Sequence, residues 1–164
     1  MDIIITAATV LATVSNSIGT TDSDYYYNAN VKNNQVNRLE VLHKCGNYLS
    51  RKVQYNFIYD DENRLLVKEA QHWNADRLRW EPSYKLEYAY NENGFSVARS
   101  DWDRKADAYG KVNEMMDYTV LNDNVMAISI LKRTNETLEL DSRMLAMNSS
   151  DAMLLAMADK ELAH

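Results

Sequence analysis

The sequence has few of the residues on which compact catalytic sites are usually built. In 164 residues it contains one cysteine, one proline, four glycines and three histidines. Because Cys45 has no second cysteine to pair with, an intramolecular disulfide, a CxxC redox pair and a cysteine-based zinc site are excluded. A catalytic triad needs a positioned histidine, and only His43, His72 and His164 exist. We expect His72 to be a partly exposed histidine at a strand end and Cys45 to be a buried structural thiol.

Basic residues are also fewer than acidic ones. The chain has 18 Lys and Arg against 24 Asp and Glu, which gives a formal net charge of -6 and a pI of about 5.0. Such a chain has no general positive field, so nucleic acid is disfavoured as a partner. Asp101, Asp103 and Asp107 offer oxygen atoms to calcium, but the glycine and the closing glutamate of an EF-hand loop are missing. We therefore expect no metal centre and no cofactor.

The first 19 residues are nearly uncharged and are apolar or small. This texture is typical of a secretory signal peptide, although Asp2 stands where a basic residue is usual. The alternative is an N-terminal strand that begins at Ile3. The apolar run stops near Val14, short of the roughly 20 residues that a helix needs to span a bilayer. The sequence predicts a signal peptide at 1–19, a secreted or periplasmic location and no stable membrane span.

The rest of the chain divides into a short irregular segment and one domain. Residues 20–37 are rich in Asp, Asn, Ser and Tyr and show little periodicity, which is typical of a linker or a peripheral strand. Residues 38–164 are of a length suited to a single domain, and their pattern is that of a β-rich one.

Short polar stretches recur at an interval of 31 residues. They are YDDENRL, YNENGF and LNDNV, which begin at Tyr59, Tyr90 and Leu121. Each contains Asn or Gly, the residues that most readily adopt the left-handed backbone conformation of a tight hairpin. We predict hairpin corners at 60–63, 91–94 and 122–124, of which the third is the most degenerate copy.

Apolar and polar side chains alternate in the strands that enter these corners. The apolar set is Val53, Tyr55, Phe57, Tyr59, Tyr84, Leu86, Tyr88, Tyr90, Met116, Tyr118 and Val120. A period of two indicates strands with one buried face and one wet face. The pattern predicts a mainly β fold, an antiparallel β-meander of about six strands built from about three hairpin repeats.

A meander with one apolar face needs a cover. Residues 150–162 fit a C-terminal amphipathic helix behind a serine cap. Its apolar positions are Met153, Leu154, Met157 and Leu162. The other candidate cover is 38–49, in which Cys45-Gly46-Asn47 is a plausible turn. Leu138 and Leu140 alternate with acidic residues, which predicts a further strand.

Large aromatic residues gather near the loops at the sheet edge opposite the corners. The rings are Trp73, Trp80, Trp102 and Tyr109, and polar neighbours are Asn74, Arg79 and Asp103. Aromatic faces beside such groups are suited to stacking on sugars or peptide side chains. The alternative is that the rings fold back and seal the sheet edge. We expect a non-enzymatic binding or interaction module for a glycan, a peptide or a protein, with these seven residues as its ligand-binding set and no catalytic residue.

Two other functions are compatible with the sequence. A polymer-acting hydrolase needs two carboxylates at a fixed separation, one of them in an apolar pocket, and Asp101 with Asp103 is the candidate pair. A structural subunit can instead form a homo-oligomer through its sheet edges, for which 51–58 and 125–132 are the candidate strands.

Two resemblances bear on the fold. The motif YDDENRL resembles the tyrosine-aspartate motif of YD or Rhs-type repeats, which build successive hairpins, with Asn63 where that motif carries glycine. More broadly, the export-like start together with YNFIYDDENRLL, HWNADRLRWEPSYKLEYAYNENG and DWD is similar to a small family of exported proteins from gut Bacteroidales, known as a domain of unknown function. This resemblance covers most of the chain after residue 40. It implies export and a β-rich fold, and it transfers no catalytic residue.

Overall fold

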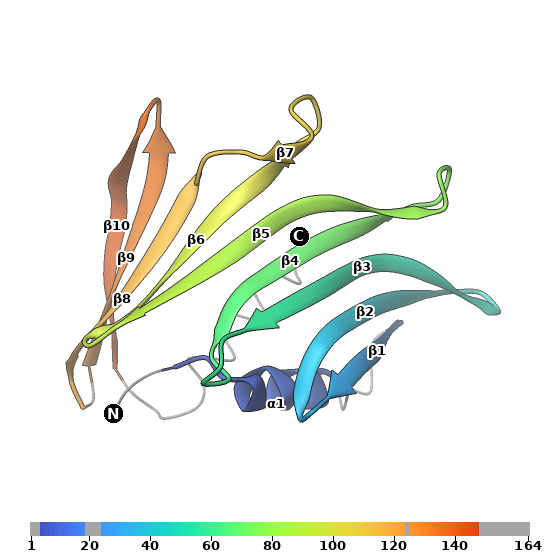
Figure 1. Ribbon diagram of the computed structural model, residues 1–164, viewed down its shortest axis with the longest axis horizontal. Coiled ribbons are helices and arrows are strands. Elements are labelled where there is room, and N and C mark those ends of the chain that lie inside the picture. Colours follow the sequence, from blue (N-terminus) through green and yellow to red (C-terminus); the bar gives the residue numbers. More distant parts are fainter. Residues whose placement is uncertain (1–3, 19–23, 124, 148–164) are drawn as a thin grey trace.

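The computed structural model describes residues 4–18, 24–123 and 125–147. The elements in chain order are α1 (Ala7–Ile18), β1 (Tyr25–Lys32), β2 (Gln35–Cys45), β3 (Tyr48–Tyr59), β4 (Leu65–Asn74), β5 (Arg79–Asn91), β6 (Gly94–Asp103), β7 (Ala108–Tyr109), β8 (Glu114–Asn122), β9 (Val125–Thr134) and β10 (Thr137–Met147). Within the described residues ten strands form one antiparallel sheet, in which each strand lies beside its neighbours in sequence and β7 pairs with β6 off the main path (Figure 1). The predicted mainly β meander is confirmed, but it has more than six strands, and the number of repeats stays a prediction.

The corner at 60–63 shows how Asp and Asn replace glycine in these turns. The Asp60 carboxylate accepts the backbone N–H of Glu62 at 3.0 Å and that of Arg64 at 2.8 Å. Asn63 adopts the left-handed conformation, with φ of 62°. Side-chain acceptors and a left-handed Asn therefore close the hairpin between β3 and β4, as predicted.

The next corner repeats this plan with a glycine. The Asn91 side chain accepts the backbone N–H of Asn93 at 2.8 Å, and Gly94 has φ of 151°. A Cβ atom on Gly94 would lie 1.9 Å from the carbonyl oxygen of Tyr118 on β8. Only glycine fits this close approach of two backbones. The third corner joins β8 to β9, again at the predicted place.

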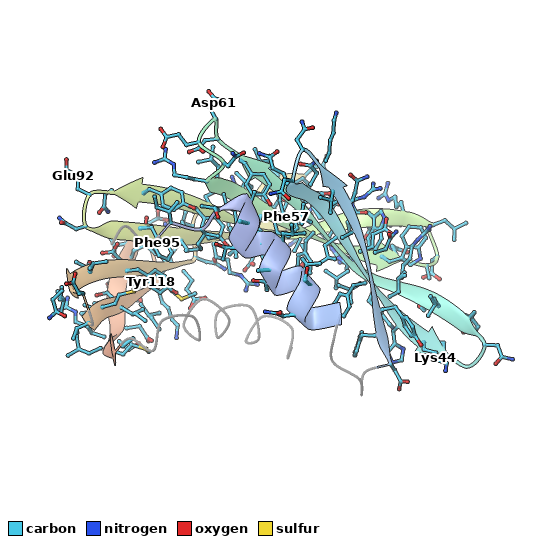
Figure 2. The ribbon with its side chains drawn as sticks, turned by 90° about the horizontal axis from the view of Figure 1, so that it is seen from below. Lys44, Phe57, Asp61, Glu92, Phe95 and Tyr118 are labelled. Carbon is cyan, nitrogen blue, oxygen red and sulfur yellow. The ribbon has the colours of Figure 1, made fainter. Side chains whose placement is uncertain are left out.

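The apolar face of the meander forms the core. Phe95 is 1% exposed and stacks on Tyr118, with ring centroids 4.5 Å apart (Figure 2). Every member of the alternating apolar set predicted from the sequence belongs to this core or packs against it. The period-two prediction for β3, β5 and β8 is therefore confirmed.

The N-terminal region forms a helix, so the alternative of an N-terminal strand from Ile3 is wrong. Thr6 caps the helix, since its hydroxyl accepts the backbone N–H of Thr9 at 3.4 Å. Helix α1 packs against β2 and β1, with Val10 and Val14 buried. No helix in the described part of the chain is long and apolar enough to cross a membrane.

Other segments were also assigned from the sequence, and not all of these assignments agree with the structure. The stretch 38–49 is no cover for the sheet: it forms most of β2 and the start of β3, joined through Gly46 at φ of 62°. Within the described residues the edges of the sheet are β1 and β10, whereas the predicted edges 51–58 and 125–132 are paired on both sides. The strand predicted at Leu138 and Leu140 is confirmed as part of β10. The predicted helix at 150–162 lies outside the described residues.

Candidate functional site

Two hairpin tips project from the end of the sheet opposite the corners, between β4 and β5 and between β6 and β7 (Figure 1). Each begins with a side chain that accepts a backbone N–H of its own loop, Asn74 at 3.0 Å and Asp103 at 2.8 Å. Each contains a left-handed residue with φ of 50°, Leu78 in one and Asp107 in the other. The two tips are thus built alike, and the side chains of Asn74 and Asp103 are engaged in turn formation.

Each tip carries one pair of aromatic rings. Trp73 and Trp80 lie opposite each other on β4 and β5, with centroids 5.2 Å apart and ring planes at 70°. Trp102 and Tyr109 repeat this on β6 and β7, at 4.9 Å and 81°. All four rings are partly exposed. We call these four residues the aromatic rim. The structure therefore brings together the four rings selected from the sequence as two matching pairs on strand ends.

Cationic side chains from neighbouring strands lie over two of these rings. The Arg51 guanidinium is 4.6 Å from the Trp73 centroid, and the Lys85 ammonium is 5.3 Å from that of Tyr109. These distances are within the range of cation–π attraction. Neither cation was identified from the sequence, because only the strand register places them beside the rings.

A polar cluster adjoins the rim. The Glu69 carboxylate accepts the Tyr109 hydroxyl at 2.5 Å and the side-chain amides of Asn56 and Gln71, each at 3.2 Å. The side-chain amide of Gln54 donates to the Gln71 oxygen at 3.0 Å. Gln54 is 6% exposed, and its own side-chain oxygen has no hydrogen-bond partner. We call these five residues the Glu69 cluster.

The Glu69 cluster lies on the face of the sheet opposite the core. Successive strand residues point to opposite faces of a sheet. Asn56 of the cluster follows the buried Tyr55, and Lys85, which lies over the Tyr109 ring, precedes the buried Leu86. Burial, together with the neighbouring Glu69 carboxylate, raises the pKa of Tyr109 above its usual range. Tyr109 therefore remains a neutral hydrogen-bond donor to Glu69 at physiological pH. This polar cluster was missed from the sequence because its members come from β3, β4 and β7.

Arg79, the remaining residue selected from the sequence, pairs with a carboxylate at the first tip. Its guanidinium is 3.3 Å from Glu81, which also contacts Arg77 at 3.2 Å and His72 at 3.5 Å. A hydrogen bond with Asn74 and the two arginines hold the pKa of Glu81 below its usual range. The first tip thus carries a charged side as well as an aromatic one.

The other residues weighed from the sequence are spread out. Asp101 is exposed and pairs with Arg99 at 3.0 Å, so Asp101 and Asp103 do not form a pair in an apolar pocket. Cys45 is half-buried rather than buried, and its sulfur lies 3.4 Å from His43, a neighbour not expected from the sequence. Among the described residues no three His, Cys, Asp or Glu side chains gather where they could hold a metal ion.

The fold and the site define a class of protein: one long antiparallel meander with its core on one face and aromatic pairs beside a polar cluster on the other. Residues 1–120 match the model of a family of unknown function, DUF3836, and the chain belongs to that family. The resemblance to a Bacteroidales family of unknown function is thereby confirmed. No curated protein matches the chain.

Three solved structures are similar to the chain. A DUF3836 family protein from Bacteroides vulgatus is 28% identical, with a TM-score of 0.51 over 52% of this chain and 88% of its own. A protein of unknown function from Bacteroides fragilis is 17% identical, with a TM-score of 0.67 over 84% of this chain and 98% of its own. A DUF3836 family protein from Parabacteroides distasonis is 16% identical, with a TM-score of 0.52 over 82% and 99%. The last two likenesses concern the fold alone.

Proposed function

We propose that the chain is an exported, non-enzymatic binding module whose ligand surface is the aromatic rim together with the Glu69 cluster. The observation that carries this proposal is the repetition of one aromatic pair on two hairpin tips built alike. Rings needed only for the core belong on the inner face, where Phe95 and Tyr118 stack. Large rings that remain partly exposed beside polar groups are typical of a recognition surface.

The chemistry of the surface favours a glycan over a peptide as the ligand. Sugars combine apolar C–H faces, which pack on aromatic rings, with hydroxyl groups that need both donors and acceptors. Asn56 and Gln71 supply partly exposed amide groups, and the partly exposed Glu69 carboxylate supplies an acceptor. Arg51 and Lys85 of this chain already lie over the rings of Trp73 and Tyr109. These two rings therefore need no cationic group from the ligand.

Export is supported by the nearly uncharged, apolar N-terminal sequence. The expected mature chain lacks roughly the first 15 to 20 residues. N-terminal sequencing of the protein from the periplasm or culture medium of its host measures this directly. A chain that begins at Met1 and is found only in the cytoplasm would rule out export.

The binding proposal can be tested without a label. The chain has three tryptophans, and all of them belong to the rim, so their fluorescence reports on the proposed surface alone. Glycan and peptide arrays identify a ligand, and titration of that ligand should shift the tryptophan emission. Trp80→Ala and Trp102→Ala should each weaken binding at least tenfold. Leu121→Ala, at a 55% exposed position beside the β8–β9 corner at the opposite end of the sheet, should leave binding unchanged.

A second candidate function is assembly through the β10 edge. Strand β10 borders the described sheet and exposes three large apolar side chains, Leu140, Met144 and Leu145, at 53%, 46% and 66%. An apolar edge strand is a template for pairing with another chain. Light scattering of the wild type and of Leu145→Lys tests this, since a dimer that dissociates in the variant would support edge pairing. The hydrolase alternative has no comparable support, because Asp101 and Asp103 are both exposed.

A further inference from the structure

The N-terminal segment (residues 4–18) is attached to the sheet by specific backbone hydrogen bonds. The backbone N–H of Leu65 donates to the carbonyl oxygen of Ile5 at 2.8 Å, and that of Ala7 donates to Asn63 at 3.0 Å. The Tyr90 hydroxyl lies 2.7 Å from the Leu65 carbonyl oxygen and 3.1 Å from that of Ile5, so its one proton is shared between these two acceptors. Thr6 therefore forms an isolated β-bridge with Arg64 at the β3–β4 corner, immediately before the helix begins at Ala7.

The helix that follows binds through one apolar stripe. Ala7, Val10 and Val14 are 4%, 8% and 5% exposed, whereas Ala12 on the other side is exposed. With the partly buried Leu11 these residues have the i, i+3, i+4, i+7 spacing of an amphipathic helix lying in a groove. Figure 2 shows α1 lying across the strands.

The surface beneath the N-terminal segment consists of apolar side chains and unsatisfied backbone groups once that segment is absent. We call it the α1 groove. It is formed by Val36, Leu39, Val41, Asn63, Leu65 and Tyr90. Removal of residues 1–19 would leave the Leu65 N–H and the Asn63 carbonyl without their partners and would uncover the apolar side chains of β2. Uncovering the apolar side chains costs free energy unless another group covers them, and the two backbone groups are then available to bond that group.

We propose that the α1 groove of the mature protein is a docking site for a peptide segment of another protein. The segment it accepts has a few extended residues followed by an uncharged helix with small apolar side chains at i, i+3, i+4 and i+7. This inference rests on the proposed export, which removes the segment that fills the groove here. Backbone hydrogen bonds at the corner supply affinity for any sequence, and the stripe along β2 selects small apolar residues.

The chemistry of the partner follows from what the groove holds in this structure. Helix α1 has the sequence AATVLATVSNSI, with no charged residue in either its first or its last turn. Its buried positions carry only Ala and Val side chains, so bulky or charged residues would not fit there without rearrangement. The groove lies on the core face and the aromatic rim on the outer side, so the two surfaces can bind separate ligands.

The test uses the full chain, so that folding does not depend on a truncated protein. A protease site is inserted between Gly19 and Ser23, and the purified protein is cut after it has folded. A fluorescent peptide of residues 4–18 should then exchange into the groove, with saturable anisotropy. In competition, a Val10→Asp peptide should bind at least tenfold more weakly than wild type. An Ala12→Asp peptide, with the same charge on the exposed side, should bind within threefold of it.

The protein side offers a second readout. Tyr90→Phe removes the hydroxyl shared between the Ile5 and Leu65 oxygens and should weaken peptide binding several-fold, while circular dichroism shows the sheet intact. Equal competition by the Val10→Asp and Ala12→Asp peptides, or no exchange at all, would overturn the proposal. So would a leader-free protein that dimerises through the groove, or one that takes up the peptide only after removal of residues 148–164.

Failure of this inference can be told apart from failure of the proposed function. If sequencing of the exported protein finds residues 4–18 in place, the groove remains filled, and the proposed removal of the N-terminal segment and the partner proposal both fail. If the segment is absent but the peptides do not discriminate, only the groove proposal fails. The tryptophan titration of the rim gives its own result in either case.

Discussion

Replacing Tyr109 with Phe removes one hydroxyl group and keeps the ring of the aromatic rim. That hydroxyl donates to the Glu69 carboxylate at 2.5 Å and so links the β7 strand to β4. A hydrogen bond to a charged group contributes about 1.5–3 kcal/mol. Glu69 retains two amide donors and is only half-buried, so we expect a loss at the lower end, about 1.5 kcal/mol.

This loss corresponds to a measurable change in melting temperature. In a domain of this size each kcal/mol shifts the midpoint by about 2–4 °C, so Tyr109→Phe should melt about 3–6 °C lower. The matched control is Tyr48→Phe at a 68% exposed position, which should change stability by less than about 0.5 kcal/mol. Urea unfolding followed by circular dichroism gives the free energies of unfolding.

A double-mutant cycle with Glu69→Gln isolates the contact itself. We expect a coupling energy of about 1 kcal/mol between positions 69 and 109, because the two side chains share one hydrogen bond. Additive effects of the two substitutions, or a Tyr109→Phe protein as stable as Tyr48→Phe, would refute the account of the Glu69 cluster.

The remaining predictions concern the fold. Gly94→Ala places a Cβ atom 1.9 Å from the Tyr118 carbonyl oxygen and should destabilise the protein by about 3 kcal/mol or more in urea unfolding. Gly46→Ala, with nothing within 4 Å, should cost about 1–2 kcal/mol, and equal losses would contradict the close approach. Burial raises the pKa of Tyr90 to about 12, and it also raises the pKa values of Tyr59 and Tyr109. Since the unfolded tyrosines ionise near pH 10, stability should hold below about pH 10 and fall as the pH rises towards 12, and a flat profile would count against this burial.

The meander itself could be predicted because its signals are local. Asp60 and Asn63 carry the chemistry of a tight turn in their own side chains, and the alternation before them needs no knowledge of the partner strand. The same holds for the corner at Gly94. Strand β10 was also recognisable, because Leu138 and Leu140 alternate with acidic residues.

The two N-terminal elements, α1 and β1, were harder to predict, for different reasons. Strand β1 is mostly exposed at the sheet edge, so Tyr25–Lys32 shows little of the alternation that a half-buried strand requires. Helix α1 contains Val10, Thr13 and Val14, whose branched side chains favour strands. Its helical form is set by the Thr6 cap and by packing against β2. The cap is only a weak signal in the sequence, and the packing leaves no signal there.

Only part of the candidate site could be predicted from the sequence. The rings of the rim could be selected by composition, but the pairing of Trp73 with Trp80 depends on a strand register with a bulge after Ala70. Glu69 gave no signal, because one acidic residue in a strand is ordinary. Its donors, including Tyr109, reach it only after three separate elements have folded together.

The most direct test of the central claim uses the indole N–H signals of the three tryptophans in a ¹H–¹⁵N NMR spectrum. All three residues belong to the rim. Addition of a ligand identified on the arrays should move the signals of Trp73, Trp80 and Trp102 in a saturable way and leave the amide of the buried Phe95 in place. If the ligand binds while all three indole signals stay fixed, the aromatic rim is not the binding surface.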